Sequence, residues 1–228
     1  MSGSVQGEMT RRRAIQGVLA AGVSGAALLR GVCRAATANP VTRVEEDWAL
    51  QIGTPDTNNT APMVKTVMSA QADLLGYCAF YDINYEMLGA PPKLVHGGFG
   101  IEMWNPNQQW PDTTCYPTTS LLKFPNEVVT WTQQLDLSNG ILSFSVWDAS
   151  SLTWGSASGR VLNLSKASVP YADLSGYTPT VSVAESGPTW YPQLVASLKL
   201  KTVRYYDSGG AIVQTDSTGY QVCPSATP

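Results

Sequence analysis

Histidine is almost absent from this chain of 228 residues, which contains only His96. A zinc site built from several histidines, including the two-histidine zinc helix, is therefore excluded. A Ser-His-Asp triad would have to use His96, which stands beside Gly97-Gly98. Because no Gly-x-Ser-x-Gly motif supplies the nucleophile of such a triad, we interpret His96 as a loop residue.

Motifs that bind cofactors are also missing. The chain has neither a phosphate-binding loop nor a dinucleotide fingerprint. Asp56-Thr57-Asn58-Asn59 offers oxygen atoms to calcium, but its spacing matches no complete calcium loop, so a turn is the simpler interpretation. We expect no metal and no cofactor, and calcium remains an unsupported alternative.

Basic residues are scarce once the first 38 residues are set aside. Of the 14 basic and 17 acidic residues, five basic and one acidic residue precede Asn39. Residues 39–228 therefore carry nine basic and sixteen acidic side chains. Nucleic-acid binding needs a basic stripe, and membrane-surface binding needs a basic amphipathic helix, so neither partner is expected.

The start of the chain has the layout of an export signal. Arginines at 11–13 precede an apolar run over 14–29, and Ala36-Thr37-Ala38 fits a small-x-small cleavage site. The arginines resemble a twin-arginine signal, although the usual Phe after the pair is missing. The run is shorter than the ~20 residues that span a bilayer. An uncleaved anchor and a general secretion signal are the alternatives.

We therefore expect residues 1–38 to be a signal peptide and residues 39–228 to be one domain. The protein should be exported to the periplasm, the cell surface or the extracellular space. After removal of the signal, no contact with the membrane is expected. The oligomeric state is left open.

Cysteine usage allows one disulfide after export. Cys78, Cys115 and Cys223 lie in residues 39–228, and none has a C-x-x-C spacing. Cys78 falls within an apolar strand pattern and is expected to be a buried hydrophobic residue. Cys115 and Cys223 both lie near turns, so our guess for the disulfide is this pair.

Period-two alternation recurs through residues 39–228, whereas helical periodicity is scarce. That pattern predicts an all-β sandwich or barrel. From Leu75 to Met87 alternate residues share an apolar face, and Asp82 and Glu86 on the other face are expected to meet water. Ser138-Asn139-Gly140 predicts a hairpin turn between strands over 127–137 and 141–147.

About nine strands are expected in total, enough for two packed antiparallel sheets. The remaining candidates are Trp48–Ile52, Met63–Met68, Phe99–Trp104, Leu194–Lys201, Ala211–Thr215 and Gly219–Cys223. Residues 105–125 and 165–192 are rich in Pro, Thr, Ser and Tyr and are expected to form long loops.

The segment over 194–200, followed by Val203-Arg204-Tyr205-Tyr206, resembles the closing strands of the concanavalin A-like sandwich group, which includes lectins and glycan hydrolases. Glu45-Glu46-Asp47-Trp48 and Val128-Val129-Thr130-Trp131 resemble segments of secreted bacterial proteins. The resemblance implies a two-sheet antiparallel sandwich of jelly-roll or concanavalin A-like type. It carries no catalytic motif and so implies no function.

Paired carboxylates are the best candidates for catalysis, because glycosidases need two of them about 5–10 Å apart. Glu102 and Trp104 are two residues apart in a predicted strand, so both side chains point the same way and can touch one ligand. Glu86 is a weak catalytic partner for Glu102, and Asp82 and Asp148 are further partners. The alternative is that these acids form the solvated face of half-buried strands.

The seven tryptophans supply a second kind of candidate site. An exposed indole suits a sugar ring or a partner protein, and packing in the core is the alternative for each ring. Trp104, Trp110 and Trp147 stand among polar neighbours or in loops. With Glu102 they form the predicted ligand-binding set.

From these features we expect a secreted, non-catalytic sandwich that binds a glycan or another cell-surface component. One alternative is a glycan hydrolase that uses Glu102 with a second carboxylate. The other is a structural subunit of a cell-envelope assembly. Of these, an enzyme is the less favoured hypothesis.

Overall fold

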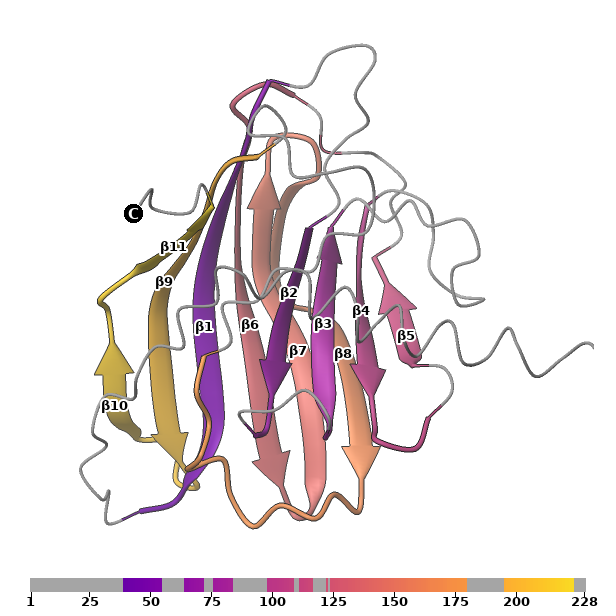
Figure 1. Cartoon of the computed structure of the whole chain (residues 1–228), viewed down its shortest axis with the longest axis vertical. Coiled ribbons are helices and arrows are strands. Elements are labelled where there is room, and N and C mark those ends of the chain that lie inside the picture. The colour runs from indigo at the N-terminus through magenta and orange to yellow at the C-terminus, as the bar shows by residue number, and fades with distance from the viewer. Residues whose placement is uncertain are drawn as a thin grey trace, which may run out of the picture.

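The protein is described by a computed structural model, which covers residues 39–54, 64–71, 76–83, 98–108, 111–116, 122, 124–179 and 195–223. Over these ranges the chain forms eleven strands in two antiparallel sheets that pack face to face, and no helix (Figure 1). The predicted all-β, two-sheet antiparallel sandwich is confirmed. The predicted signal peptide at 1–38 lies outside the described residues.

The larger sheet has seven strands in the order β10-β9-β1-β6-β7-β8, and β11 also pairs with β9. Its strands are β1 (Val41–Ile52), β6 (Val128–Ser138), β7 (Ile141–Ser151), β8 (Gly155–Ala167), β9 (Val195–Asp207), β10 (Ile212–Asp216) and β11 (Tyr220–Cys223). Strands β1 and β9, from opposite ends of the described chain, lie side by side in this sheet. The two ends of the domain are therefore held together by a ladder of backbone hydrogen bonds.

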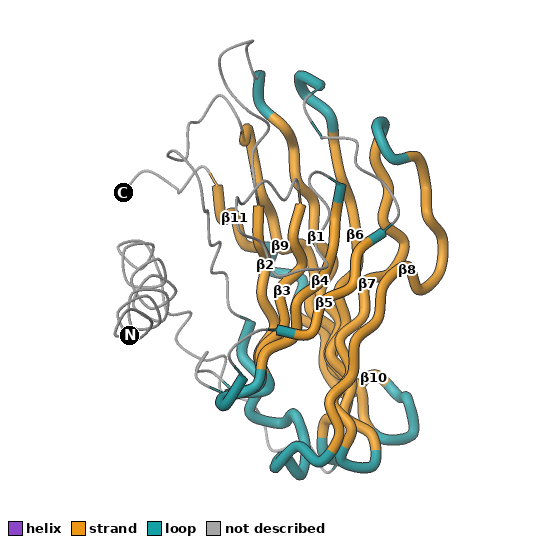
Figure 2. Tube along the Cα trace, turned by 90° about the vertical axis from the view of Figure 1, so that its right-hand side faces the viewer, coloured by secondary structure: helices purple, strands orange, loops and turns teal. Residues whose placement is uncertain are grey.

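The smaller sheet has four strands in the order β2-β3-β4-β5. They are β2 (Val64–Ser69), β3 (Cys78–Ile83), β4 (Phe99–Trp104) and β5 (Asp112–Cys115). A view turned by 90° shows the described residues as strands and loops (Figure 2). Within the described ranges, no helix is long and apolar enough to cross a membrane.

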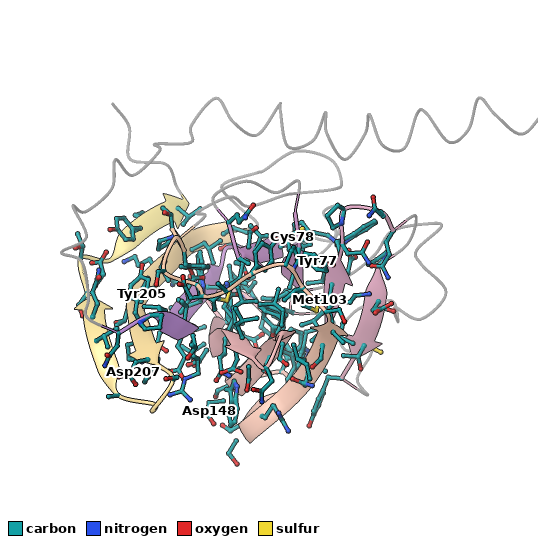
Figure 3. All side chains as sticks on the ribbon, turned by 90° about the horizontal axis from the view of Figure 1, so that it is seen from below. Tyr77, Cys78, Met103, Asp148, Tyr205 and Asp207 are labelled. Carbon is teal, nitrogen blue, oxygen red and sulfur yellow. The ribbon has the colours of Figure 1, made fainter. Side chains whose placement is uncertain are left out.

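Alternation along each strand sends one set of apolar side chains between the two sheets. Trp48 of β1 lies opposite Trp131 of β6, and their rings stack at 6.1 Å. Tyr81 of β3 reaches across from the smaller sheet, with its ring 5.1 Å from that of Trp131. Figure 3 shows side chains filling this space, with Met103 turned inward and Asp148 on the outside.

The predicted hairpin is confirmed between β6 and β7. Asn139 and Gly140 adopt φ values of 51° and 72°, the left-handed region that a tight two-residue turn requires. Two strands were not expected from the sequence. Strand β5 falls in the predicted loop over 105–125, and β8 shows weak apolar alternation because most of its side chains are exposed or half-buried.

Replacing Gly140 with Ala should lower the free energy of unfolding by about 1–2 kcal/mol, because a Cβ is unfavourable at this positive φ. No atom lies within 4 Å of the added Cβ, so the loss of stability would come from backbone strain and not from a steric clash. Urea denaturation measures it. Gly176→Ala is the matched control, since Gly176 has open space and no positive φ, and it should change stability by less than about 1 kcal/mol. Equal effects of the two changes would contradict the turn assignment.

Candidate functional site

The strongest cluster of charged side chains lies on the face of the smaller sheet that points away from the interior. In β3 the apolar residues Tyr81 and Ile83 point inward, so Asp82 between them points outward. The same alternation turns Glu102 of β4 and Lys65 of β2 to the outer face. Pairing of Lys65 with Asp82 in adjacent strands places the three groups together.

A single ammonium group holds both carboxylates of this cluster. Lys65 Nζ lies 2.6 Å from Asp82 Oδ1 and 3.0 Å from Glu102 Oε1. The second oxygen of Glu102 accepts a hydrogen bond of 2.9 Å from Trp104 Nε1. The three charges come from β2, β3 and β4, which are neighbours in the smaller sheet, so the pairing of these strands brings the charges together.

Burial makes the electrostatics of this site unusual. Asp82 is fully buried and Glu102 is 5% exposed. Burial raises the pKa of Asp82 from 3.8 to about 7, Lys65 opposes this rise, and the charge of Glu102 adds to it. Burial opposes the charge of Lys65, but attraction to the two carboxylates outweighs burial and raises the pKa of the lysine. The lysine therefore stays charged.

Among the residues that the structure describes, the second oxygen of Asp82 has no hydrogen-bond partner, although it is buried. A buried polar atom without a partner is costly, and such atoms gather at functional sites. Asp82 thus combines an unused oxygen with a pKa near neutrality. Beside it lies Glu102, which accepts one hydrogen bond from the charged Lys65 and one from the neutral Trp104. The arrangement places a carboxyl group that can hold a proton near pH 7 beside a second carboxyl group.

Of the residues predicted for the ligand site, the structure brings together Glu102 and Trp104. Trp147 lies in β7 on the other sheet, on the side away from the interior, with the exposed Arg160 6.0 Å from its ring. Trp110 and Glu86 lie outside the described residues. The use of Glu102, Trp104, Trp110 and Trp147 as one binding set stays a prediction, and Trp147 does not share a face with the first two.

Two features of the cluster differ from what the sequence indicated. Asp82 was expected to face water, but it is completely buried. Alternation along the strand shows that Asp82 lies on the opposite face from Tyr81 and Ile83. It does not show whether that face of the sheet is exposed to water or buried. Lys65 was not selected at all. The available signal was a lysine within the apolar run Val64-Lys65-Thr66-Val67-Met68, since a buried lysine requires a partner.

A second buried acid, Glu46 of β1, was also missed. It lies between the sheets with no exposed surface and accepts hydrogen bonds from Trp48, Gln133 and Tyr177. Glu46 could have been found in the sequence, because it continues the alternation of the apolar residues Trp48, Leu50 and Ile52 and so takes an inward position.

The guessed disulfide joins two cysteines that the structure keeps apart. Cys115 of β5 pairs with Gly100 of β4, whereas Cys223 of β11 pairs with Leu198 of β9. Figure 1 shows β5 and β11 on opposite sides of the sandwich. Bridged cysteines have Cα atoms about 4.4–6.8 Å apart, so this placement does not support the pair. Cys78 is buried, as its strand pattern indicated.

Within the described residues, no three His, Cys, Asp or Glu side chains are grouped so that they could hold a metal ion. In the carboxylate cluster, Lys65 takes the position between the two acids that a cation would otherwise fill. The calcium alternative at Asp56-Thr57-Asn58-Asn59 falls outside the described residues. The predicted absence of a cofactor stays a prediction.

No protein-family model and no curated protein sequence matches the chain. Among solved structures, the chain is similar to the crystal structure of scytalido-glutamic peptidase with a transition-state analogue inhibitor. The similarity has a TM-score of 0.32 and 9% sequence identity, and it covers 79% of this chain and 82% of the peptidase chain. At this level it does not locate a site or assign a reaction.

The predicted function as a non-catalytic, glycan-binding sandwich must be corrected. The solved structure reported above is that of a peptidase, and its similarity to this chain is too weak to carry an argument about function. In this chain the buried carboxyl groups of Asp82 and Glu102 both bind the ammonium group of Lys65, and burial raises the pKa of Asp82 to about 7. A passive sugar-binding face needs neither feature. The alternative function, hydrolysis by Glu102 with a second carboxylate, stays a prediction.

Replacing Lys65 with Met should lower the free energy of unfolding by about 3–5 kcal/mol at pH 7, because it leaves two buried carboxylates without a counter-charge. Adding Asp82→Asn to this variant should recover part of the loss. Chemical denaturation of the two single variants and the double variant measures the coupling.

Lys166→Met serves as the control for Lys65→Met, because Lys166 forms its ion pair with Asp112, whose side chain is 50% exposed. That change should cost less than about 1 kcal/mol. Equal losses at the two lysines, or no recovery in the double variant, would contradict the electrostatic account of the cluster.

Proposed function

We propose that this chain is a hydrolase of glycosidic bonds in which Asp82 and Glu102 are the two catalytic carboxyl groups. The observation that carries the proposal is the binding of both carboxylates by Lys65, with distances of 2.6 Å and 3.0 Å. The two oxygens can be no farther apart than these two distances together. That limit is close to the ~5–5.5 Å separation of retaining glycosidases and shorter than the ~6.5–9.5 Å of inverting ones.

The environments of the two acids support different roles. Asp82 has a pKa of about 7 and an oxygen without a partner, so it can hold the proton that a leaving group needs. Glu102 accepts hydrogen bonds from Lys65 and Trp104, which hold its carboxyl group in position to act as nucleophile. Glu102 also keeps some exposure, whereas Asp82 keeps none. Substrate would therefore meet Glu102 first.

Trp104 supports a sugar as the substrate. Its indole nitrogen is occupied by Glu102, which fixes the ring beside the carboxylate. The side chain remains partly exposed at the end of β4. A fixed, partly exposed indole offers a flat apolar face on which a sugar ring can stack.

We also propose that the sandwich belongs to the concanavalin A-like group and acts outside the cytoplasm, after removal of residues 1–38. The two-sheet antiparallel architecture supports the first part, and the arginine-led apolar segment of the sequence supports the second. The proposed reaction needs no cofactor, since the chain supplies both the acid and the nucleophile.

Glu102→Gln and Asp82→Asn should each lower kcat/KM by about 10²–10⁴-fold, because the first change removes the nucleophile and the second removes the acid–base group. Wild-type activity should fall as the pH rises through about 7, where Asp82 loses its proton. The measurement is reducing-end release from soluble β-1,3-glucan, β-1,4-glucan, xylan and chitosan, with circular dichroism to verify folding.

Asp112→Asn is the matched control, since Asp112 lies on the same sheet but pairs with Lys166 outside the cluster. It should retain wild-type activity. If the wild type cleaves none of the four polysaccharides, the glycosidase proposal fails. Cleavage of a protein such as casein that depends on Asp82 and Glu102 would keep the carboxylate pair but reassign the substrate.

The close spacing of the two carboxyl groups makes a separate prediction about stereochemistry. A retaining enzyme forms a covalent intermediate and then hydrolyses it, so the first product should have the anomeric configuration of the substrate. Proton NMR of the product within the first minutes, before mutarotation, detects this configuration. An inverted first product would require a wider carboxylate separation than Lys65 permits.

A further inference from the structure

Glu46 is a buried acid that the proposed reaction does not use. It lies on β1 directly opposite Gln133 of β6, and neither side chain has any exposed surface. Both point into the space between the two sheets, on the opposite side of the smaller sheet from the Asp82–Glu102 cluster. A polar pair in this position interrupts the apolar layer that holds the sandwich together.

Hydrogen bonds from three parts of the chain converge on Glu46. Tyr177 Oη donates to Oε1 at 2.6 Å, and Trp48 Nε1 and Gln133 Nε2 donate to Oε2 at 3.0 Å and 2.6 Å. Gln133 Oε1 in turn accepts a bond of 2.7 Å from Thr66 Oγ1 of β2. The chain of bonds therefore runs from the smaller sheet through Gln133 to Glu46 of the larger sheet.

No cation balances the charge of Glu46 among the described residues. The groups that face it are Trp48 on its own strand, Gln133 from β6 and Tyr177 from the segment after β8. Tyr205 of β9 packs against the ring of Tyr177, and Thr66 of β2 is reached through Gln133. The pKa of Tyr177 is raised well above 10 by burial and by Glu46, so it stays neutral. Asp82 differs, because Lys65 compensates its charge.

We propose that Glu46 is a pH-sensitive lock between the two sheets, which holds them together when protonated and loosens the Thr66–Gln133 contact when ionised. Hydrogen bonds from neutral donors reduce the cost of the buried charge, but they do not remove it. Loosening of the layer around Gln133 lets the charge regain solvation. The lock thus acts on the contact between the sheets and not on the outer face.

The direction of the pH effect follows from burial. Burial raises the pKa of Glu46 from 4.5 to about 7, against the three hydrogen bonds that lower it. The folded protein therefore binds this proton more tightly than the unfolded chain does. The stabilisation is fully present below pH 4.5 and is lost as the pH rises to about 7. Asp82, whose pKa is also raised, acts in the same direction and must be separated from Glu46.

Glu46→Gln tests the lock, because glutamine stays neutral at every pH. Its unfolding equilibrium constant at pH 8 should be at least about tenfold smaller than that of the wild type, and at pH 4.5 it should be within about threefold. The same difference should appear in an Asp82→Asn background, which removes the second titrating group. Glu45→Gln is the matched control, since Glu45 is the neighbouring acid on the outer face and pairs with Arg204.

Equal destabilisation of Glu46→Gln at pH 4.5 and pH 8 would overturn the proposal, since Glu46 would then matter only as a hydrogen-bond acceptor. An unchanged pH dependence would overturn it as well. If Glu46→Gln does not fold, a fluorescence titration of the wild type still tests the proposal. Because Trp48 donates to Glu46, tryptophan emission of the folded protein should change with a midpoint between about pH 6 and 8 and should lose this transition in Trp48→Phe. A flat emission profile over that range would refute the lock.

Discussion

The contact of Trp131 with both Trp48 and Tyr81 is the interaction on which the architecture depends. Trp48 and Trp131 stack within the larger sheet, and Tyr81 brings the smaller sheet against them. These large rings bury the apolar area that holds the two layers together. Once this contact fixes which face of β3 points inward, Asp82 is forced to the opposite face. The position of the carboxylate cluster therefore follows from the packing of aromatic rings on the other side of the same strand.

Asp82 and Glu46 illustrate two ways of accommodating a carboxyl group away from water. Asp82 has a charged partner in Lys65, which in turn binds Glu102. Among the described residues, the partners of Glu46 are the dipoles of Trp48, Gln133 and Tyr177. The pKa of each acid is raised to about 7, since burial outweighs the favourable partners in both places. Glu46 of the larger sheet points into the space between the sheets, whereas Asp82 lies on the outer face of the smaller sheet, so the proposed chemistry and the proposed lock are spatially separate.

Strong local patterns were sufficient to predict several elements. Strand β4 has the bounds expected from its sequence, and the turn at Asn139-Gly140 has the predicted geometry. Strand β8 could not be found in this way. It lies at one edge of the larger sheet, where most of its side chains remain exposed or half-buried, so selection for apolar alternation is weak. Strand β5 has only four residues, too few for a periodic signal.

The sequence by itself determined the fold class and the pairing of Glu102 with Trp104 on one face, because both depend on a period of two along the backbone. Only the tertiary structure decided that Asp82 is buried, that Lys65 joins it to Glu102, and that Glu46 meets Gln133 and Tyr177. These contacts unite residues that are up to 131 positions apart. Alternation states which residues share a face of a strand. Which strands become neighbours, and which faces lose contact with water, is settled by the packing of the two sheets.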